Sequence, residues 1–263
     1  MALMCRDAFT CTRDDLQIRG DVFSLENSTR EPESIPDAII CHGFMSNRRT
    51  TYPYARTLAT AGYTTWCLDF CGGGIPCESD GATTDMSALT EVEDLRAVLT
   101  YVQSQHESAT KPLLAGCSQG GLVAALLAAE LGETIRGLAL LYPALTIPDD
   151  ARAGTMLGMN FDPEHIPQDL HSGHMAIGQR YVTDVRDMDA YAEIPAYTGR
   201  VLIIHGEKDS IVPVASSRRA ERAYRDAGAD VQLVVLPRAD HGFYGEDQRT
   251  AEATLSNFAR SLV

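Results

Sequence analysis

The sequence has 263 residues, of which 44% are hydrophobic and 22% charged, and its 36 acidic against 22 basic side chains give a formal charge of −14. This is the composition of an ordinary globular protein, and the length suits one α/β domain. Basic pairs occur only at 48–49 and 218–219, so clustered cations for a phosphate backbone are lacking and we expect no nucleic-acid partner. The chain has neither the apolar run that a membrane span needs nor a signal-peptide pattern, so we expect neither.

The seven cysteines all lie in the first half of the chain. Their odd number leaves at least one thiol unpaired, and reduced thiols are typical of cytosolic proteins, so we expect a cytoplasmic location. Cys67, Cys71 and Cys77 are close in sequence, but no Cys-x-x-Cys pair and no matching histidine pair accompanies them. We therefore predict no metal site.

Two apolar stretches at 8–12 and 16–25 flank a charged turn and predict an antiparallel hairpin. A proline-containing loop at 31–36 leads into Ala38–Cys41, a short apolar run typical of a buried parallel strand. Strands and helices then alternate. We predict helix 54–61, strand 63–70, helix 89–102 with Asp85 or Ser87 as its N-cap, strand 113–116, helix 122–131 and strand 137–141.

This alternation with short connections is typical of right-handed crossovers and of a mostly parallel sheet with helices on both faces. The pattern stops at 145–199, which is too long for one crossover helix or for a structureless loop. We predict a small folded lid there. The remaining elements are strand 201–204, helix 215–227, strand 231–236 and helix 247–262. The fold class is thus α/β, as a single domain over 1–263 with a lid inserted at about 145–199.

Residues 116–121 read Gly-Cys-Ser-Gln-Gly-Gly and lie between a predicted strand and a predicted helix. This is the Gly-x-Ser-x-Gly motif in the context that it requires. Its glycines permit a sharp turn that strains the backbone of Ser118 and pushes the hydroxyl into solvent. The helix N-terminus at the same point favours negative charge on a substrate oxygen. Ser118 is therefore the candidate nucleophile.

A serine hydroxyl is a weak nucleophile, so it needs a neighbouring base and a carboxylate that orients the base. Asp209 follows one predicted strand and His241 follows the last one, and carboxyl ends of strands are where open α/β sheets place ligands. Glu207 and Asp240 are rivals for the acid, although Asp240 is adjacent to the base, where its side chain would point elsewhere. We predict Ser118, Asp209 and His241 as the catalytic residues.

Six other histidines compete with His241 for the role of base. His42 and His205 each follow a strand beside a glycine, and we expect them to support local structure. His106 is expected at an exposed helix end. The predicted lid carries the rest, His165, His171 and His174.

Acyl transfer also needs donors for the tetrahedral oxyanion, usually two backbone N–H groups. The amide of Gln119 directly follows the nucleophile. The His-Gly-Phe sequence at 42–44 allows a tight turn after a buried strand and presents the amide of Phe44. We therefore predict Phe44 and Gln119 as the oxyanion hole.

These motifs together make the chain resemble the α/β-hydrolases, nearly from end to end, and within them the bacterial cinnamoyl or feruloyl esterases. The resemblance rests on His-Gly-Phe at 42–44, the serine motif at 116–121, Asn-Phe-Asp-Pro-Glu-His-Ile-Pro at 160–167 and Asp-His-x-Phe at 240–243. The match at 160–167 is the most specific, because many esterases and lipases share the others. The resemblance implies a serine carboxylesterase that cleaves feruloyl, caffeoyl or coumaroyl esters through an acyl-enzyme, without a cofactor.

In that family the lid covers the acyl pocket and positions the phenolic ring. The resemblance therefore implies Asp150 and Tyr181 as contacts of the ring hydroxyl. Two positions depart from the family: Cys117 stands where a histidine is usual, and Gly73 lies in Gly-Gly-Gly where Gly-His-Gly is usual. Cys117 also raises the alternative of a thiol nucleophile, as in dienelactone hydrolases, but the central position of the motif is Ser118.

Two other functions stay open at this stage. One is a monoacylglycerol lipase or general short-chain carboxylesterase. The other is a non-catalytic receptor of the same fold, which the complete set of catalytic residues disfavours. The expected partner is a small aryl ester, with no nucleic acid and no membrane, and a homodimer is left open.

Overall fold

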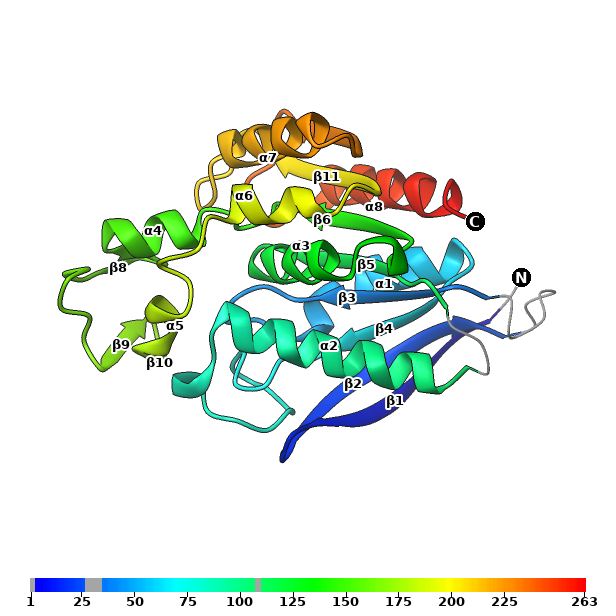
Figure 1. Ribbon diagram of the computed structural model, residues 1–263. Coiled ribbons are helices and arrows are strands. Elements are labelled where there is room, and N and C mark those ends of the chain that lie inside the picture. The colour runs from blue at the N-terminus through cyan, green and yellow to red at the C-terminus, as the bar shows by residue number, and fades with distance from the viewer. Residues whose placement is uncertain (1–2, 27–34, 107–109) are drawn as a thin grey trace.

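The computed structural model describes residues 3–26, 35–106 and 110–263. An eight-stranded sheet forms its centre, in the order β1-β2-β4-β3-β5-β6-β11-β12 (Figure 1). These strands are β1 Met4–Arg13, β2 Leu16–Leu25, β3 Asp37–Cys41, β4 Thr64–Leu68, β5 Leu113–Cys117, β6 Gly137–Leu141, β11 Arg200–Gly206 and β12 Asp230–Leu236. Strand β2 pairs antiparallel with β1 and β4, and the other neighbours are parallel. The mostly parallel sheet and its N-terminal hairpin are confirmed.

The central strands are buried on both faces because helices cover both. Along β11, Val201 and Ile203 pack into one apolar cluster while Leu202 and Ile204 pack into the other, as the two-residue period of a strand requires. The first cluster includes residues of α2, α3 and α7, and the second includes residues of α1 and α8. The bounds are α1 Tyr52–Thr60, α2 Ala88–Ser104, α3 Gln119–Leu131, α7 Val214–Asp226 and α8 Gly245–Arg260.

Helix ends follow local chemistry. Ser87 rather than Asp85 is the N-cap of α2, because its side chain accepts from the Thr90 amide while Thr90 Oγ1 accepts from the Ser87 amide. Helix α3 begins at Gln119, earlier than the expected 122, directly after the serine turn. Of the expected loop at 31–36, residues 31–34 lie outside the described part of the chain.

The segment between β6 and β11 folds as short elements rather than as one helix. They are α4 Ile147–Ala153, β7 Thr155–Met156, β8 Met159–Asn160, β9 Asp169–Ser172, β10 Met175–Gly178, α5 Arg180–Thr183, α6 Ala190–Glu193 and a 3₁₀ turn at Ile194–Ala196. The part from α4 to α5 projects from one end of the sheet, and α6 returns alongside α3 (Figure 1). We call residues 145–199 the lid.

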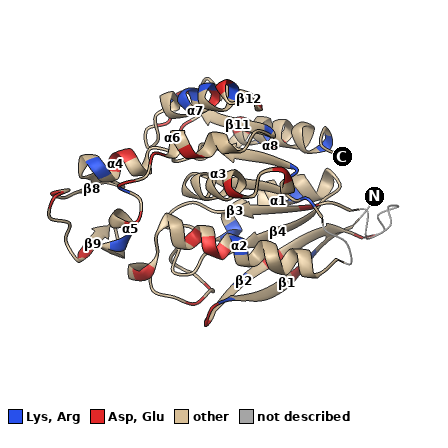
Figure 2. Cartoon of the chain, viewed as in Figure 1, with Lys and Arg blue, Asp and Glu red and all other residues tan. Residues whose placement is uncertain are grey.

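Both basic pairs of the sequence are engaged by carboxylates. Arg48 Nε lies 2.6 Å from Asp21 Oδ2, and Arg49 bonds Glu78 at 2.7 Å. On α7, where charges of both signs alternate (Figure 2), the guanidinium of Arg218 lies 2.5 Å from Glu207. These pairs therefore do not act as free cationic patches. Among the described helices, none combines the length and the apolar character that a bilayer crossing demands.

Candidate active site

The turn at 116–121 has the steric strain that its glycines predict. Ser118 caps α3 with φ of 52° and ψ of −119°, a left-handed φ that a serine adopts only under constraint. A Cβ on Gly116 would lie 2.0 Å from the Gly120 carbonyl oxygen, and one on Gly120 would lie 2.3 Å from the His42 carbonyl oxygen. The turn thus tolerates only glycine at both positions and holds Ser118 at the carboxyl end of β5.

Three side chains from the ends of three strands meet at Ser118. His241 Nε2 lies 3.1 Å from Ser118 Oγ, and His241 Nδ1 lies 2.8 Å from Asp209 Oδ2. Asp209 follows β11 and has a fully buried side chain, whereas the His241 side chain, in the loop after β12, is 20% exposed. The arrangement can pass the serine proton to an imidazole that a carboxylate orients.

The Asp209 carboxylate is held by more than the base. Its Oδ1 accepts from the amides of Ile211 at 2.9 Å and Val212 at 2.8 Å, and His205 Nε2 lies 3.1 Å from its Oδ2. Burial raises the pKa of Asp209, but the hydrogen bonds from His205, His241 and the Val212 amide together hold it well below its ordinary value. Asp209 therefore stays ionised beside the base.

His205 is a site residue whose contact with Asp209 the sequence did not reveal. Its side chain is fully buried, with Nδ1 2.7 Å from Ser217 Oγ, so both ring nitrogens are engaged. The sequence places it four residues before Asp209 at a strand end, which is the only signal that could have pointed to this contact. The rival acids are occupied elsewhere: Glu207 pairs with Arg218, and Asp240 Oδ1 accepts from the Ser210 amide.

The other histidines do not contact Ser118. His42 is buried, and its Nε2 accepts from the Phe70 amide at 3.1 Å. His106, expected at an exposed helix end, is instead 17% exposed with Nε2 2.7 Å from Asp37 Oδ2, because the end of α2 packs near β3. The remaining three lie in the lid, as expected.

Phe44 and Gln119 both line the cavity at Ser118. Among the hydrogen bonds of the described residues, neither amide has an acceptor within the chain. A Cβ on Gly43 would lie 3.0 Å from Ser118 Cβ, so a glycine there lets the loop pass close to the nucleophile. The two amides are thus free to donate to an oxygen bound beside Ser118.

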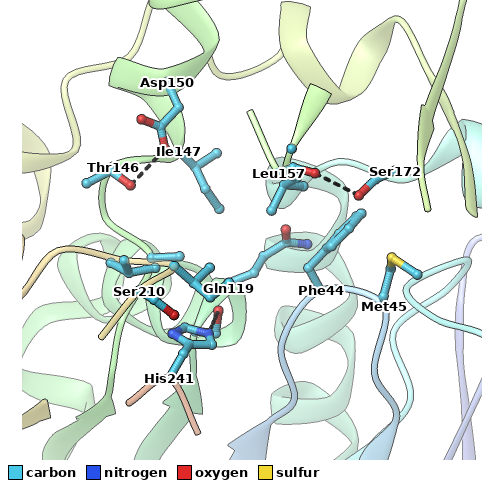
Figure 3. A pocket seen from close by; sticks show the side chains of 15 residues that line it. Phe44, Met45, Gln119, Thr146, Ile147, Asp150, Leu157, Ser172, Ser210 and His241 are labelled. Atoms are coloured by element: carbon cyan, nitrogen blue, oxygen red, sulfur yellow. Dashed lines mark hydrogen bonds between the residues drawn. The ribbon is translucent and has the colours of Figure 1, made fainter. Parts of the chain in front are cut away.

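A cavity of about 590 Å³ opens above Ser118 and lies between the sheet and the lid. In Figure 3, Ile147 and Asp150 of the lid face His241 across it. The walls are mainly apolar with a few polar groups, as is typical of small-molecule sites. The lining residues are Phe44, Met45, Ser118, Gln119, Ala144, Thr146, Ile147, Asp150, Leu157, Gly158, Ser172, Ser210, Ile211, Val212 and His241.

The two residues that the resemblance implies as ring contacts differ in position. Asp150 lines the cavity, where Thr146 Oγ1 lies 2.8 Å from its Oδ2 and burial raises the pKa of its carboxyl (Figure 3). Tyr181 is 1% exposed and does not line the cavity, because its hydroxyl donates to Gln119 Oε1 behind the cavity wall. The structure therefore brings Asp150 to the site but not the Tyr181 hydroxyl.

The positions that depart from the family have physical consequences. Burial raises the pKa of the Cys117 thiol to about 12, so the group is a neutral thiol rather than a nucleophilic thiolate. A Cβ on Gly73 would lie 2.7 Å from Phe70 Cβ, so this backbone excludes a larger residue there. Among the described side chains, no group of three or more His, Cys, Asp or Glu is placed to hold a metal ion.

Comparison with known families gives two matches. The family model described as serine aminopeptidase, S33, matches residues 36–201, and that of the dienelactone hydrolase family matches residues 181–261. The first match includes Ser118 and the lid, and the second includes Asp209 and His241. Together they cover residues 36–261, which include every strand of the large sheet except β1 and β2.

Individual relatives extend this likeness. Est1E from Butyrivibrio proteoclasticus, whose structure is solved with ferulic acid bound, is 30% identical in sequence to this chain. The match covers 95% of this chain and 97% of the Est1E chain, with a TM-score of 0.86. A monoacylglycerol lipase of Mycolicibacterium smegmatis is 24% identical, over 87% of this chain and 88% of its own. The Paleococcus ferrophilus monoacylglycerol lipase structure, 18% identical with a TM-score of 0.69, covers 98% of this chain and all of its own and shares the fold.

Proposed function

Because the chain belongs to the serine aminopeptidase S33 family of the α/β-hydrolase fold and is a carboxylic ester hydrolase, we propose that it cleaves hydroxycinnamate esters through an acyl-enzyme on Ser118. The observation that carries the proposal is the hydrogen-bonded set Ser118, His241 and Asp209. Ser118 and His241 line a mainly apolar cavity that has one carboxyl, Asp150, on its far side. The relative that binds ferulic acid supports the aryl substrate class.

In the proposed reaction, Ser118 Oγ attacks the ester carbonyl carbon while His241 Nε2 accepts its proton. Asp209 stabilises the imidazolium that forms, and the amides of Phe44 and Gln119 donate to the oxyanion. His241 returns the proton to the leaving alcohol as the tetrahedral intermediate collapses. A water molecule, activated by the same histidine, then hydrolyses the acyl-enzyme.

The acyl group would extend from Ser118 toward the lid, where apolar side chains contact the ring and Asp150 meets a ring hydroxyl. Moving a phenol hydroxyl from water into the cavity costs free energy unless the hydroxyl finds a hydrogen-bond partner there. A carboxyl at this point therefore favours substrates that carry the hydroxyl. Burial raises the pKa of the Asp150 carboxyl, which favours its protonated form, and a protonated carboxyl can donate as well as accept in this contact.

A second candidate is a monoacylglycerol lipase or general short-chain esterase. The similarity to the Mycolicibacterium smegmatis lipase over 87% of the chain favours it. The apolar lining of the cavity would also suit an alkyl chain. The two candidates use the same catalytic residues and differ only in what fills the cavity.

The test compares three methyl esters, which share one leaving group, with one glyceryl ester. The purified chain is assayed on methyl ferulate, methyl cinnamate, methyl butyrate and glyceryl monobutyrate. We expect kcat/KM for methyl ferulate to exceed that for methyl butyrate by about tenfold or more, and methyl cinnamate, which lacks the ring hydroxyl, to fall below methyl ferulate. A preference for glyceryl monobutyrate would instead select the lipase candidate.

A further inference from the structure

The side chain of Gln119 is held by two buried groups, one from helix α2 and one from the lid. Gln119 Nε2 donates to Glu91 Oε2 at 2.8 Å, and the Tyr181 hydroxyl donates to Gln119 Oε1. Glu91 belongs to the core helix α2 and is 1% exposed, while Tyr181 belongs to the lid helix α5. The two hydrogen bonds thus link the lid to the core through Gln119, with Tyr181 donating to Gln119 and Gln119 donating to Glu91.

Tyr181 also contacts the second residue of the proposed oxyanion hole. Its ring lies 5.4 Å from the ring of Phe44 between centroids. One lid side chain therefore touches both residues of the proposed oxyanion hole, Gln119 through its hydroxyl and Phe44 through its ring. Phe44 and Gln119 line the cavity, whereas Tyr181 does not.

We propose that Glu91 and Tyr181 are positioning residues, which fix the Gln119 and Phe44 amides for the oxyanion by clamping the Gln119 side chain between core and lid. The assignment rests on the proposed function, in which these two amides bind the oxyanion. Donors to an oxyanion contribute most when they are held in place before the reaction. A clamp on the side chain next to the elbow supplies that rigidity.

Burial favours the neutral form of the Glu91 carboxyl in this clamp. Its Oε2 accepts from Gln119 Nε2, its Oε1 has no hydrogen-bond partner among the described residues, and the carboxyl of Asp94 disfavours a second negative charge there. Burial raises the pKa of Glu91 well above its ordinary value. A glutamine, which has the same shape and no charge, should therefore replace it with little loss.

Further hydrogen bonds dock the lid on the same end of α2. Ser87 Oγ donates to Asp184 Oδ2 at 2.6 Å, and Thr83 Oγ1 donates to the Ala176 carbonyl oxygen at 2.5 Å. Helix α5 is therefore fixed on both sides of Tyr181 relative to α2. In the proposal, the position of the lid on α2 therefore affects the position of the oxyanion donors through the contact between Tyr181 and Gln119.

The test separates positioning from ring recognition by its substrate dependence. The variants are Tyr181→Phe, Glu91→Leu and Glu91→Gln, with Tyr191→Phe as a matched lid control whose hydroxyl lies away from Gln119. Each is assayed on methyl ferulate and on p-nitrophenyl butyrate, with kcat expressed per active site titrated by a fluorophosphonate. Misfolded protein, which does not react with the fluorophosphonate, is then left out of the enzyme concentration.

We expect Tyr181→Phe and Glu91→Leu to lower kcat about tenfold on both esters while KM changes less than about threefold. Glu91→Gln and Tyr191→Phe should stay within about threefold of wild type. The inhibition constant of a trifluoromethyl ketone, which forms an oxyanion on Ser118, should rise by the factor by which kcat falls.

Three results would overturn the assignment while leaving the proposed function in place. A loss with Tyr181→Phe that is confined to methyl ferulate would mean that Tyr181 recognises the ring. Equal losses in Glu91→Gln and Glu91→Leu would mean that the carboxylate charge matters. Wild-type levels of kcat in Tyr181→Phe and Glu91→Leu would show that these side chains do not position the oxyanion donors. A wild-type chain inactive on both esters would instead overturn the proposed function, and the assignment with it.

Discussion

The sheet with its serine turn and the lid are built in different ways. Strands β3, β5 and β6 are buried along their whole length, and the turn at Ser118 is fixed by glycines that contact backbone on both sides. The lid strands β7 and β8 have two residues each, and β9 alternates exposed and buried positions. The sheet can therefore hold atoms in a fixed geometry, whereas the lid supplies walls and polar contacts around the cavity.

This difference separates the tasks of the site. The proposed catalytic residues Ser118, Asp209 and His241 all follow strands of the large sheet. Ile147, Asp150 and Leu157 reach the cavity from the lid. Changes in the sheet should therefore affect every ester, and changes in the lid should affect some esters more than others. Tyr181 would be the exception, a lid residue that acts on the chemistry.

The largest effect is expected from Ser118→Ala and His241→Ala. Each should lower kcat by roughly 10⁴- to 10⁶-fold on every ester, and the double variant should lose little more, because the two residues act as a unit. Steady-state rates of the three proteins check this. Cys117→Ala, the matched control beside the nucleophile, should retain most of the activity, and a Ser118→Ala protein with a tenth of the wild-type kcat would exclude Ser118.

Asp150→Ala should produce the substrate-selective loss expected of the lid. Without the carboxyl, a buried ring hydroxyl lacks its partner, so kcat/KM on caffeoyl or feruloyl esters should fall by one to two powers of ten, about 1–3 kcal/mol. Hydrolysis of p-nitrophenyl butyrate should change little. Asp149→Ala, which removes the exposed neighbouring carboxyl, serves as the control. Equal losses on both substrates would show that Asp150 only stabilises the lid.

His205→Gln should lower kcat by about tenfold on all esters, because it weakens a hydrogen bond to the buried Asp209 carboxylate. The loss should grow as pH falls, since the pKa of Asp209 is held down partly by His205. Rates between pH 5 and 8, compared with those of His106→Gln, measure this. A loss seen on hydroxycinnamoyl esters alone would contradict the assignment of His205 to the catalytic centre.

The smallest effect concerns stability. Since burial raises the pKa of Glu91, the folded state prefers its protonated form, and the free energy of unfolding should fall as pH rises above the ordinary glutamate pKa. Glu91→Gln should remove that part of the decline, while Glu93→Gln, at an exposed position on the same helix, should not. Urea unfolding across a pH series checks this. Parallel curves for wild type and Glu91→Gln would mean that Glu91 is not buried as a neutral acid.

The sheet was predictable because its central strands are short apolar runs between turns, as at 201–204, and because α2 has a clear helical period. The lid was predictable as an insertion but not in its elements, since two-residue strands such as β7 leave no periodic signal. The start of α3 was placed too late, because Gly120 and Gly121 resemble a loop in sequence.

The same distinction applies to the site. Motif and chain order predicted the residues that the structure brings together, Ser118, Asp209 and His241. The contact of Glu91 with Gln119 was not predictable, because it joins residues 28 positions apart through side chains buried only in the folded chain. The Tyr181 hydroxyl was likewise expected at the ligand, since sequence alone does not show that Gln119 already accepts from it.

The most direct test of the central claim is to trap the acyl-enzyme. The chain is mixed with 4-nitrophenyl ferulate, quenched during the burst and digested, and the peptide that contains 116–121 is fragmented in a mass spectrometer. We predict a burst of about one nitrophenol per active chain and a feruloyl group on Ser118, both absent in Ser118→Ala. Turnover without an acylated peptide, or acylation of Cys117 instead, would contradict the serine mechanism.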